Sequence, residues 1–433
     1  MAFPLVGTGP GIFLPISGVQ PEYRATFPYD NFTHWNETAL DEDRERPFMV
    51  AYKFPSISDL SAPEYVEIPL THPSLPEGRP ISKFTHVEAM AGPHIETWRS
   101  GNGLITIGSD PGSDYPRAIA TRDGTLLATY RWGDDTTTKI VTKKSKDGGA
   151  TWSDPVEVMS WDATKGDLKN PFLLQTSSGA ILCASLLRLT YDLTKDKEKP
   201  WHMELNVHQS KDSGQSWSKL GNILSSAPGH GIQGEWEPFL REAPDGTLQA
   251  YYSHELSPSD QDIVFRTSRD GGETWSSDFV TVAGAGNPAT RPGMPQVLDL
   301  DGGGANLLMV YENNADDKKF RVWAQTSADG GNTWAHSRII FEPGQGNAGG
   351  PGLAQIPGRL VVSFMTNQDQ PHRPYPQEAD MKIITSSDGG ATWSEPIKAI
   401  EQAGWGGVTA VDGGVAVLGA TPKGTAVMQV VAF

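Results

Sequence analysis

The chain is poor in cysteine, in long apolar runs and in positive charge. Its single cysteine, Cys183, excludes an internal disulfide and a cysteine-rich metal site. No stretch is long and apolar enough to span a bilayer. With 52 acidic and 35 basic residues the formal net charge is −17. Because phosphate binding needs a basic face, we expect neither nucleic acid nor a membrane as a partner.

The N-terminus MAFPLVGTGPG lacks the charged start and apolar run of a signal peptide. Asn31 (NFT) and Asn36 (NET) are nevertheless glycosylation sequons, which matter only in a secreted chain. We therefore expect a secreted protein whose signal peptide is absent from this chain. A cytoplasmic location, with sequons that arose by chance, stays open.

What the sequence does contain is one eight-residue pattern in five copies. They are SKDGGATW ending at Trp152, SKDSGQSW at Trp217, SRDGGETW at Trp275, SADGGNTW at Trp334 and SSDGGATW at Trp393. Their aspartates are 65, 58, 59 and 59 residues apart, a period typical of one stacked supersecondary unit. In each copy the Asp can accept local N–H bonds, the glycines supply positive φ and the Trp anchors the turn. We interpret the pattern as a structural turn, without a catalytic role for its aspartates.

The segments before each copy read as short strands joined by glycine turns. Together with 47 Gly, 33 Pro and 13 Trp, they predict an all-β fold, a six-bladed β-propeller with Asp-box turns over residues 85–433. The C-terminal tail supplies three strands of the sixth blade, and we expect the fourth from the segment near His94 to Ile107, which would join the two ends of the chain. Residues 1–84 are Pro-rich and lie outside the period. We predict that they form an extension packed on the propeller, with a seventh, degenerate blade as the alternative.

Candidate functional residues lie where the innermost strands begin. Tyr115, Asn170, Glu237 and Arg291 each precede a proline, and Gly350 is similar. Proline is tolerated at the first residue of a strand, so these residues mark entry into the central channel. In an antiparallel blade the second strand ends at the same mouth, and the Asp boxes lie at the opposite face. The arginine and aromatic side chains that this brings to the mouth are Arg117, Trp132, Trp236, Tyr252, Tyr311 and Trp405.

Two carboxylates are expected to project into one pocket from adjacent blades, Glu237 and Glu312. A glycosidase needs such a pair, one as an acid with a raised pKa and one that attacks or activates water. The alternative is that either is a salt-bridged residue of the rim. Glu235 would face the same side as Glu237 in an extended strand, which makes it the alternative acid.

The strings EWEPFL, RPGMP and LMVYE follow one another on blades three and four. They resemble the exo-1,5-α-L-arabinanases of glycoside hydrolase family 93, which are six-bladed sialidase-like propellers with Asp boxes. The resemblance extends from about Tyr115 onward. It implies that Glu237 is the general acid/base and Glu312 the nucleophile of a retaining mechanism, and that Arg291 and Tyr311 line the sugar site.

The resemblance carries further expectations. Arg117 resembles the first-blade arginine of these propellers. Arg291 should keep Glu312 ionised, and apolar neighbours should keep Glu237 protonated. Retention requires the two carboxyl groups to be about 5–5.5 Å apart, against roughly 6.5–9.5 Å for inversion. The N-terminal extension is not part of the family pattern, and for a tyrosine in the last two blades only Tyr375 and Trp405 are candidates.

Other classes stay open. A sialidase would use Arg117, Arg241 and Arg291 to hold a substrate carboxylate, with Tyr311 as the nucleophile. A uronate lyase would use His230, His254 and Arg117. A carbohydrate-binding propeller without activity would need only the aromatic platforms. The string DLDGGGAN from Asp299 is read as a hairpin turn. We expect no metal or other cofactor, and a monomer that acts on a carbohydrate.

Overall fold

The computed structural model describes residues 103–189, 202–226, 234–314 and 318–433 in full, and divides the chain into two compact units, Met1–Ile95 and Glu96–Phe433. Five strands are described in the first unit: β1 (Ile12–Leu14), β2 (Ala25–Phe27), β3 (His34–Glu37), β4 (Phe48–Lys53) and β5 (Glu64–Pro69). They form a two-stranded and a three-stranded sheet. None of these strands belongs to a blade, so the alternative of a seventh blade is wrong. The packing of residues 1–84 on the propeller stays a prediction.

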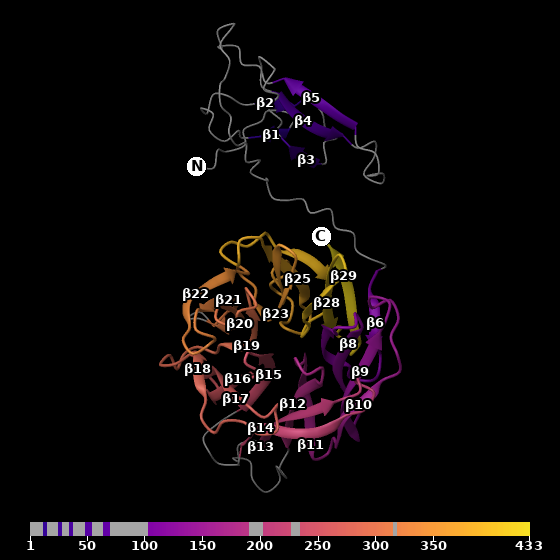
Figure 1. The fold of residues 1–433 in the computed structure, drawn as a ribbon, viewed down its shortest axis with the longest axis vertical. Helices are drawn as coiled ribbons and strands as arrows, with labels where there is room; N and C mark the ends of the chain where they lie inside the picture. Colours follow the sequence, from indigo (N-terminus) through magenta and orange to yellow (C-terminus); the bar gives the residue numbers. More distant parts are fainter. Residues whose placement is uncertain are drawn as a thin grey trace. The chain divides into compact units, whose positions relative to one another are not determined.

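The second unit contains six four-stranded sheets arranged in a ring, the predicted propeller (Figure 1). Each of the first five blades is a meander of consecutive antiparallel strands. Blade one holds β7 (Asp114–Ala120), β8 (Leu126–Gly133), β9 (Thr137–Ser145) and β10 (Val156–Asp162). Blade two holds β11 (Gly166–Gln175), β12 (Ile181–Leu189), β13 (His202–Ser210) and β14 (Ser218–Ser226). Blade three holds β15 (Gly234–Glu242), β16 (Leu248–Ser257), β17 (Asp260–Ser268) and β18 (Val280–Ala283). Blade four holds β19 (Gly293–Asp299), β20 (Leu307–Asn314), β21 (Phe320–Ser327) and β22 (Ala335–Phe341). Blade five holds β23 (Ala348–Ile356), β24 (Arg359–Thr366), β25 (Asp380–Ser386) and β26 (Ile397–Ile400).

Blade six joins the two ends of this unit. Its strands are β27 (Val408–Val411), β28 (Gly414–Ala420), β29 (Ala426–Ala432) and, outermost, β6 (Ile105–Gly108), which precedes blade one in the sequence. The register pairs Thr106 with Val427 and Ile105 with Met428. The predicted closure is therefore confirmed, and its strand comes from the end of the expected segment. Pairing the two ends covers the edge of β29 with β6.

The hydrophobic core lies between neighbouring blades. Leu205 of blade two packs in one cluster with Leu240 and Tyr252 of blade three, and the rings of Phe341 and Phe364 from blades four and five lie 4.3 Å apart. A blade that is covered on both faces needs apolar residues on both sides of its strands. This explains why the second strands are buried along most of their length and do not alternate with polar residues.

The five Asp boxes are local turns, as predicted. Asp147 accepts hydrogen bonds from Thr151 N at 2.9 Å, Thr151 Oγ1 at 2.5 Å and Ser145 Oγ at 2.7 Å. The same Ser, Asp and Thr or Ser contacts recur in the other four copies. All five boxes lie between third and fourth strands. They therefore lie at the face where the first strands end, opposite the face where the first strands begin, which we call the mouth.

Candidate active site

Every blade has one residue with left-handed backbone near the start of its innermost strand. All six have φ between 51° and 59°, and they are Tyr115, Asn170, Glu237, Met294, Gly350 and Trp405. In blades one to five the register shifts at this point, so each is a β-bulge. Five of the six are not glycine, and such strain is expected where it positions functional groups. We call these six residues the bulge ring.

Proline follows the bulge residue in the first five blades. A bulged residue is unpaired, so the missing N–H of proline costs no ladder hydrogen bond there. The prediction for blade four is wrong by three residues, because the bulge is at Met294-Pro295 and Arg291 precedes β19. The chain contains two X-Pro pairs in RPGMP, and only the sheet register distinguishes them.

Glu237 lies at the bulge of blade three, where it reaches blade four. Its Oε2 accepts a hydrogen bond from Ser253 Oγ at 2.9 Å and one from Met294 N at 3.2 Å. Burial raises its pKa, and the two hydrogen bonds and the charges of Arg117 and Arg291 oppose that shift. The Glu237 carboxylate is therefore desolvated, and the hydrogen bonds from Ser253 and Met294 stabilise its ionised form.

Glu312, at the end of β20, reaches blade five. Its Oε2 accepts one hydrogen bond, from Gly350 N at 2.7 Å. Burial, and next the charge of Glu237, raise its pKa to about 8. The charge of Glu237 thus acts on Glu312, and the catalytic roles expected for the pair stay predictions. At neutral pH we expect one proton between them, held by Glu312 because Glu237 has more donors.

Tyr375 was one of the two candidates for the tyrosine expected in the last two blades. It lies in the segment between β24 and β25, and its buried hydroxyl has no hydrogen-bond partner. A Cβ added to Gly349 would overlap Glu312 Oε2 and lie 2.6 Å from Tyr375 Oη. The hydroxyl is therefore a close neighbour of the Glu312 carboxylate, whose charge adds to burial in raising the pKa of Tyr375. The other candidate, Trp405, occupies the bulge ring in blade six.

The Arg291 guanidinium donates three hydrogen bonds to protein groups. Nη1 donates to Glu255 Oε1 and to Ser257 O, both at 2.9 Å, and Nη2 donates to Gln261 Oε1 at 2.9 Å. Glu255 also accepts a hydrogen bond from Trp236 Nε1 at 2.7 Å. Arg291 therefore braces the mouth at blades three and four, and its predicted contact with a sugar stays a prediction, as does that of Trp236.

Glu235 does not face the same way as Glu237. Its carboxylate is 2.9 Å from His254 Nδ1, and both side chains are buried. The expectation that residues two apart share a face fails here because the bulge at Glu237 interrupts the alternation. Glu235 is committed to His254, which does not favour it as the alternative acid.

Three aromatic residues that were predicted to bind substrate pack within a blade or between blades. Tyr252 is buried and its hydroxyl accepts a hydrogen bond from Arg266 Nε at 3.0 Å. Tyr311 is also buried, with its hydroxyl 2.7 Å from Ser337 Oγ. Trp132 packs against the cluster of blades one and six, and Lys139 Nζ lies 5.2 Å from its ring centroid. These positions do not favour a role in substrate binding. That role stays a prediction for all three residues.

Tyr115, Asn170 and Arg117 form the blade-one side of the site. The Arg117 guanidinium lies 3.8 Å from the Tyr115 ring centroid, and its Nη1 donates to Trp405 O at 2.8 Å. Burial raises the pKa of Tyr115, which is opposed by Arg117 and by a hydrogen bond with Asn170 and increased by the charges of Glu237 and Glu312. Tyr115 thus links Arg117 and Asn170 to the Glu237 and Glu312 carboxylates. The sequence marked Tyr115 only as the start of a strand.

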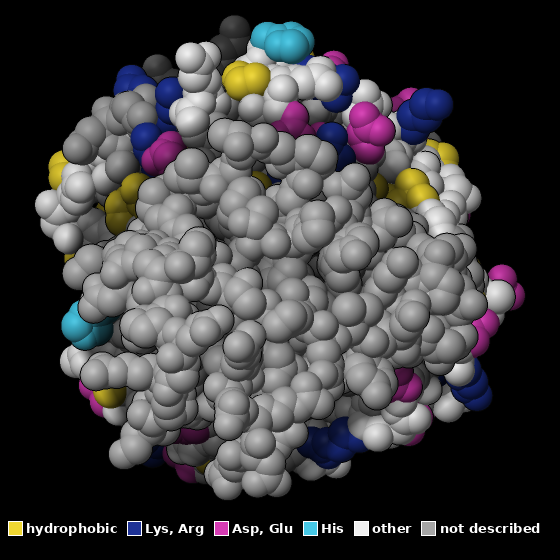
Figure 2. Space-filling view, turned by 90° about the horizontal axis from the view of Figure 1, so that it is seen from above, with side chains coloured by type: hydrophobic (Ala, Val, Ile, Leu, Met, Phe, Trp, Pro, Cys, Tyr) yellow, Lys and Arg dark blue, Asp and Glu magenta, His cyan; other side chains and the backbone are white. Residues whose placement is uncertain are grey.

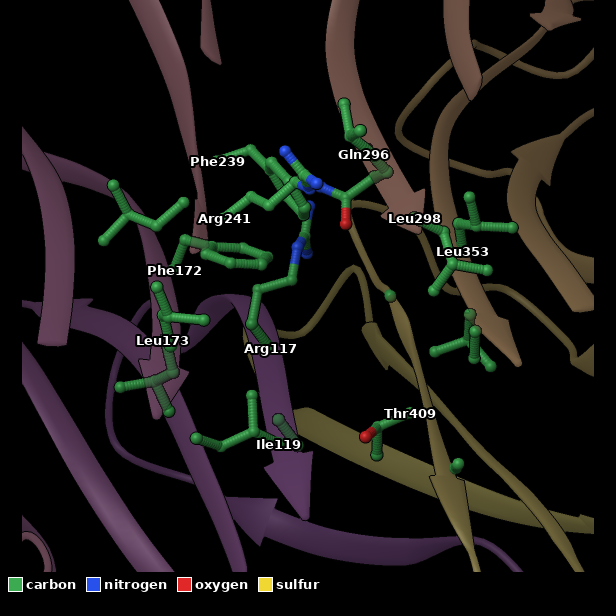
Figure 3. Close-up of a pocket in the computed structure, with 18 of the residues that line it drawn as sticks. Arg117, Ile119, Phe172, Leu173, Phe239, Arg241, Gln296, Leu298, Leu353 and Thr409 are labelled. Atoms are coloured by element: carbon green, nitrogen blue, oxygen red, sulfur yellow. The ribbon is translucent and has the colours of Figure 1, made fainter. Parts of the chain in front are cut away.

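Arg117 also lines a cavity of about 440 Å³ in the central channel. Figure 3 shows Arg117, Phe172, Phe239 and Gln296 in it, with Leu298, Leu353 and Thr409 on the other walls. Neither Glu237 nor Glu312 lines this cavity. Glu237 and Glu312 thus lie outside this cavity, and Arg117 lines it and also acts on Glu237 through its charge.

The described residues include no group of three His, Cys, Asp or Glu that could hold a metal ion, and no helix long and apolar enough to cross a membrane. The DLDGGGAN string forms the turn between β19 and β20, with Asp299 Oδ2 accepting from Gly304 N at 2.7 Å. Where side chains are coloured in Figure 2, acidic and basic groups are interspersed.

Comparisons with known proteins agree with this architecture. A model of the BNR repeat-like domain matches residues 202–346. An anhydrosialidase of Macrobdella decora is 26% identical over 225 residues, a match that covers 48% of this chain and 27% of that protein. The chain thus spans about a quarter of the length of this curated relative.

Two solved structures show the same fold. A protein of unknown function from Dyadobacter fermentans is 16% identical with a TM-score of 0.59, over 78% of this chain and 99% of that one. The family 93 α-L-arabinofuranosidase of Fusarium graminearum, solved with arabinobiose, is 23% identical with a TM-score of 0.55, over 78% and 98% of the two chains. The chain thus contains a BNR repeat-like region and shares its six-bladed propeller fold with these structures.

Proposed function

We propose that this protein is a retaining glycoside hydrolase that removes arabinose-containing units from the end of an arabinan. The observation that carries the proposal is the pair of desolvated, interacting carboxylates, Glu237 and Glu312, on neighbouring blades at one mouth. One carboxylate must be ionised and the other protonated for glycoside cleavage. A buried pair that holds one proton satisfies this requirement, which a binding-only propeller does not need.

The contacts favour the reverse of the roles implied by the resemblance. Glu237 accepts two hydrogen bonds and Glu312 one, so Glu237 is the nucleophile and Glu312 the acid. Glu312 protonates the leaving oxygen while a Glu237 oxygen attacks the anomeric carbon, and a covalent glycosyl-enzyme forms. Glu312, now ionised, then takes a proton from the water that cleaves this bond, which regenerates both groups.

A neutral sugar fits the mouth better than an acidic one. Of the three arginines that a sialidase would use, Arg291 is engaged by Glu255 and Gln261. Arg241 is buried with Gln249 and Asp299 far along β15, and Arg117 lies under the Tyr115 ring. No triad of free guanidinium groups is formed by these three residues, so a substrate carboxylate would lack its partners. The arabinobiose complex of the Fusarium structure supports an arabinan as the first substrate to test.

The test is turnover on a panel of debranched linear arabinan, aryl α-L-arabinofuranosides, sialosides and uronate-terminated glycans. We expect arabinan to release a short arabinose-containing sugar, whose anomeric carbon has the α configuration in the earliest NMR spectra. Release of sialic acid, or an unsaturated uronate, would replace the proposal by one of the other enzyme classes. Net inversion at the anomeric carbon would refute the two-step retaining mechanism, and the ionised carboxylate would then act as a base. Secretion, which the sequons indicate, stays a prediction.

A further inference from the structure

The cavity of about 440 Å³ in the central channel lies apart from the mouth. Arg117, two residues beyond the bulge of blade one, lines its inner end, and none of the six bulge-ring residues lines it. Glu242 and Asp299, the last residues of β15 and β19, line its outer end, where Gln355 is exposed. The cavity therefore extends from just inside the bulge ring to the Asp-box face. Its volume is in the range of small-molecule sites, roughly 300–1,000 Å³.

The walls of the cavity are mostly apolar and only partly buried (Figure 3). The apolar side chains that line it and keep some exposed surface are Ile119, Phe172, Leu174, Leu298 and Leu353. They lie on the innermost strands of four blades, so the surface that they leave uncovered faces the channel. Apolar surface in contact with water favours a ligand with an apolar body.

Arg117 is the cation at the inner end of the cavity. It is 5% exposed, and its Nη1 donates to Pro116 O at 2.9 Å and to Trp405 O at 2.8 Å. Its Nε and Nη2 donate to no residue in the described part of the chain, and the side chain forms no ion pair there. Nε and Nη2 form the edge of a guanidinium that can bind both oxygens of one carboxylate.

The other charged groups that line the cavity have partners in the protein. Arg241 Nη2 lies 3.8 Å from Asp299 Oδ2, so these two charges offset each other at the outer end. Glu242 Oε1 accepts a hydrogen bond from Ser177 Oγ at 2.7 Å. Arg117 is thus the charged group of the cavity that has donors left for a ligand.

We propose that the central channel binds a small organic carboxylate, whose apolar body contacts the cavity walls and whose two oxygens accept hydrogen bonds from Arg117 Nε and Nη2. This site is separate from the mouth, and the inference does not depend on the proposed function. The charge of Arg117 also favours the ionised form of Glu237, so a bound carboxylate and Glu237 compete for one cation. Removal of the Glu237 charge should therefore strengthen binding in the channel.

The experiment measures the binding of trans-cinnamate and of its uncharged amide, cinnamamide, by isothermal titration calorimetry. We expect wild type to bind cinnamate about 10- to 100-fold more tightly than the amide, the range for hydrogen bonds to a charged group. Arg117→Gln should remove this preference. Leu298→Trp and Ile119→Trp, which fill the cavity, should each prevent the binding of cinnamate. Glu237→Gln should bind cinnamate about 5-fold more tightly than wild type, the lower limit of a typical coupling between two sites.

The matched control is Arg269→Gln, which removes an exposed arginine of the Asp box in blade three and should leave binding unchanged. Thermal melts check that each variant folds, and if one of the two Trp variants does not fold, the other decides. Equal binding of acid and amide, no binding of either, or binding that survives in a folded Trp variant would overturn the inference. Unchanged affinity in Glu237→Gln would contradict the competition with Glu237. Calorimetry needs no turnover, so a wild type that binds cinnamate but is inert toward arabinan would refute the proposed function alone.

Discussion

The two faces of the propeller use carboxylates in opposite ways. At the mouth, burial raises the pKa of Glu237 and, together with the charge of Glu237, raises that of Glu312 to about 8. At the opposite face, hydrogen bonds from Thr151 and Ser145 lower the pKa of the Asp147 carboxyl to about 2. The Asp-box group is exposed and saturated with donors, whereas the mouth groups are desolvated and have few. The number of donors and the contact with water thus separate a structural carboxylate from a reactive one.

The largest expected effect comes from the pair itself. Glu312→Gln should lower turnover of arabinan by about 10²- to 10⁴-fold, because the leaving sugar needs a proton. For an aryl glycoside whose leaving group needs no proton it should spare kcat/KM, whereas kcat should fall because the second step still lacks its base. Glu237→Gln should abolish turnover of both substrates, because no nucleophile remains. The opposite pattern would restore the roles implied by the resemblance, and two mildly affected variants would show that the pair is not catalytic.

A smaller loss is expected from Gly349→Ala. The added Cβ would displace the Glu312 carboxylate and the Tyr375 hydroxyl, and a shift of about 1 Å at a reacting group can cost roughly 10²-fold. Gly303→Ala, in the exposed β19–β20 turn, is the control for a changed glycine away from the mouth. Measured kcat/KM and melting temperature separate the two effects. Full activity of Gly349→Ala would place the reacting carboxylate elsewhere.

The pH profile of kcat/KM should show which group holds the proton. Glu312 must be protonated, so activity should fall about tenfold per unit as the pH rises above about 8. Glu237 must be ionised, so activity should also fall on the acid side. Glu312→Gln, assayed on the aryl glycoside, should lose the basic limb and keep the acidic one. A basic limb that survives this substitution belongs to another group.

The smallest effect on activity is expected at the Asp-box face. Asp147→Asn should lower the melting temperature and leave kcat/KM unchanged, because the carboxylate contacts only its own turn. Its folded pKa is depressed from 3.8 to about 2, so its contribution is complete above about pH 4 and is lost as the pH falls toward 2. Thermal melts across this pH range should show that the difference in melting temperature between wild type and Asp147→Asn becomes smaller as the pH falls. An activity loss at unchanged stability would contradict the structural role.

The sequence predicted the parts of the site that depend on strand order. Glu237 and Glu312 were expected at one mouth because antiparallel strands return there, and in the structure the charge of Glu237 raises the pKa of Glu312. Their catalytic roles stay predictions. The expected facing of Glu235 and the expected start of blade four at Arg291 were wrong, because both depend on which residue of the strand forms the bulge. A left-handed residue at a bulge breaks strand alternation, and neither residue type nor periodicity reveals it.

The sequence by itself determined the six blades and the turns between their outer strands. The Asp-box carboxylate binds a residue four positions later, so the pattern needs no distant partner, and its five copies mark five of the six blades. Only the tertiary structure decided what surrounds each mouth carboxylate. The Met294 N–H donor to Glu237, the Gly350 N–H donor to Glu312 and the neighbouring Tyr375 depend on contacts between blades. Burial and donor count arise from chain segments far apart in sequence, which no local pattern contains.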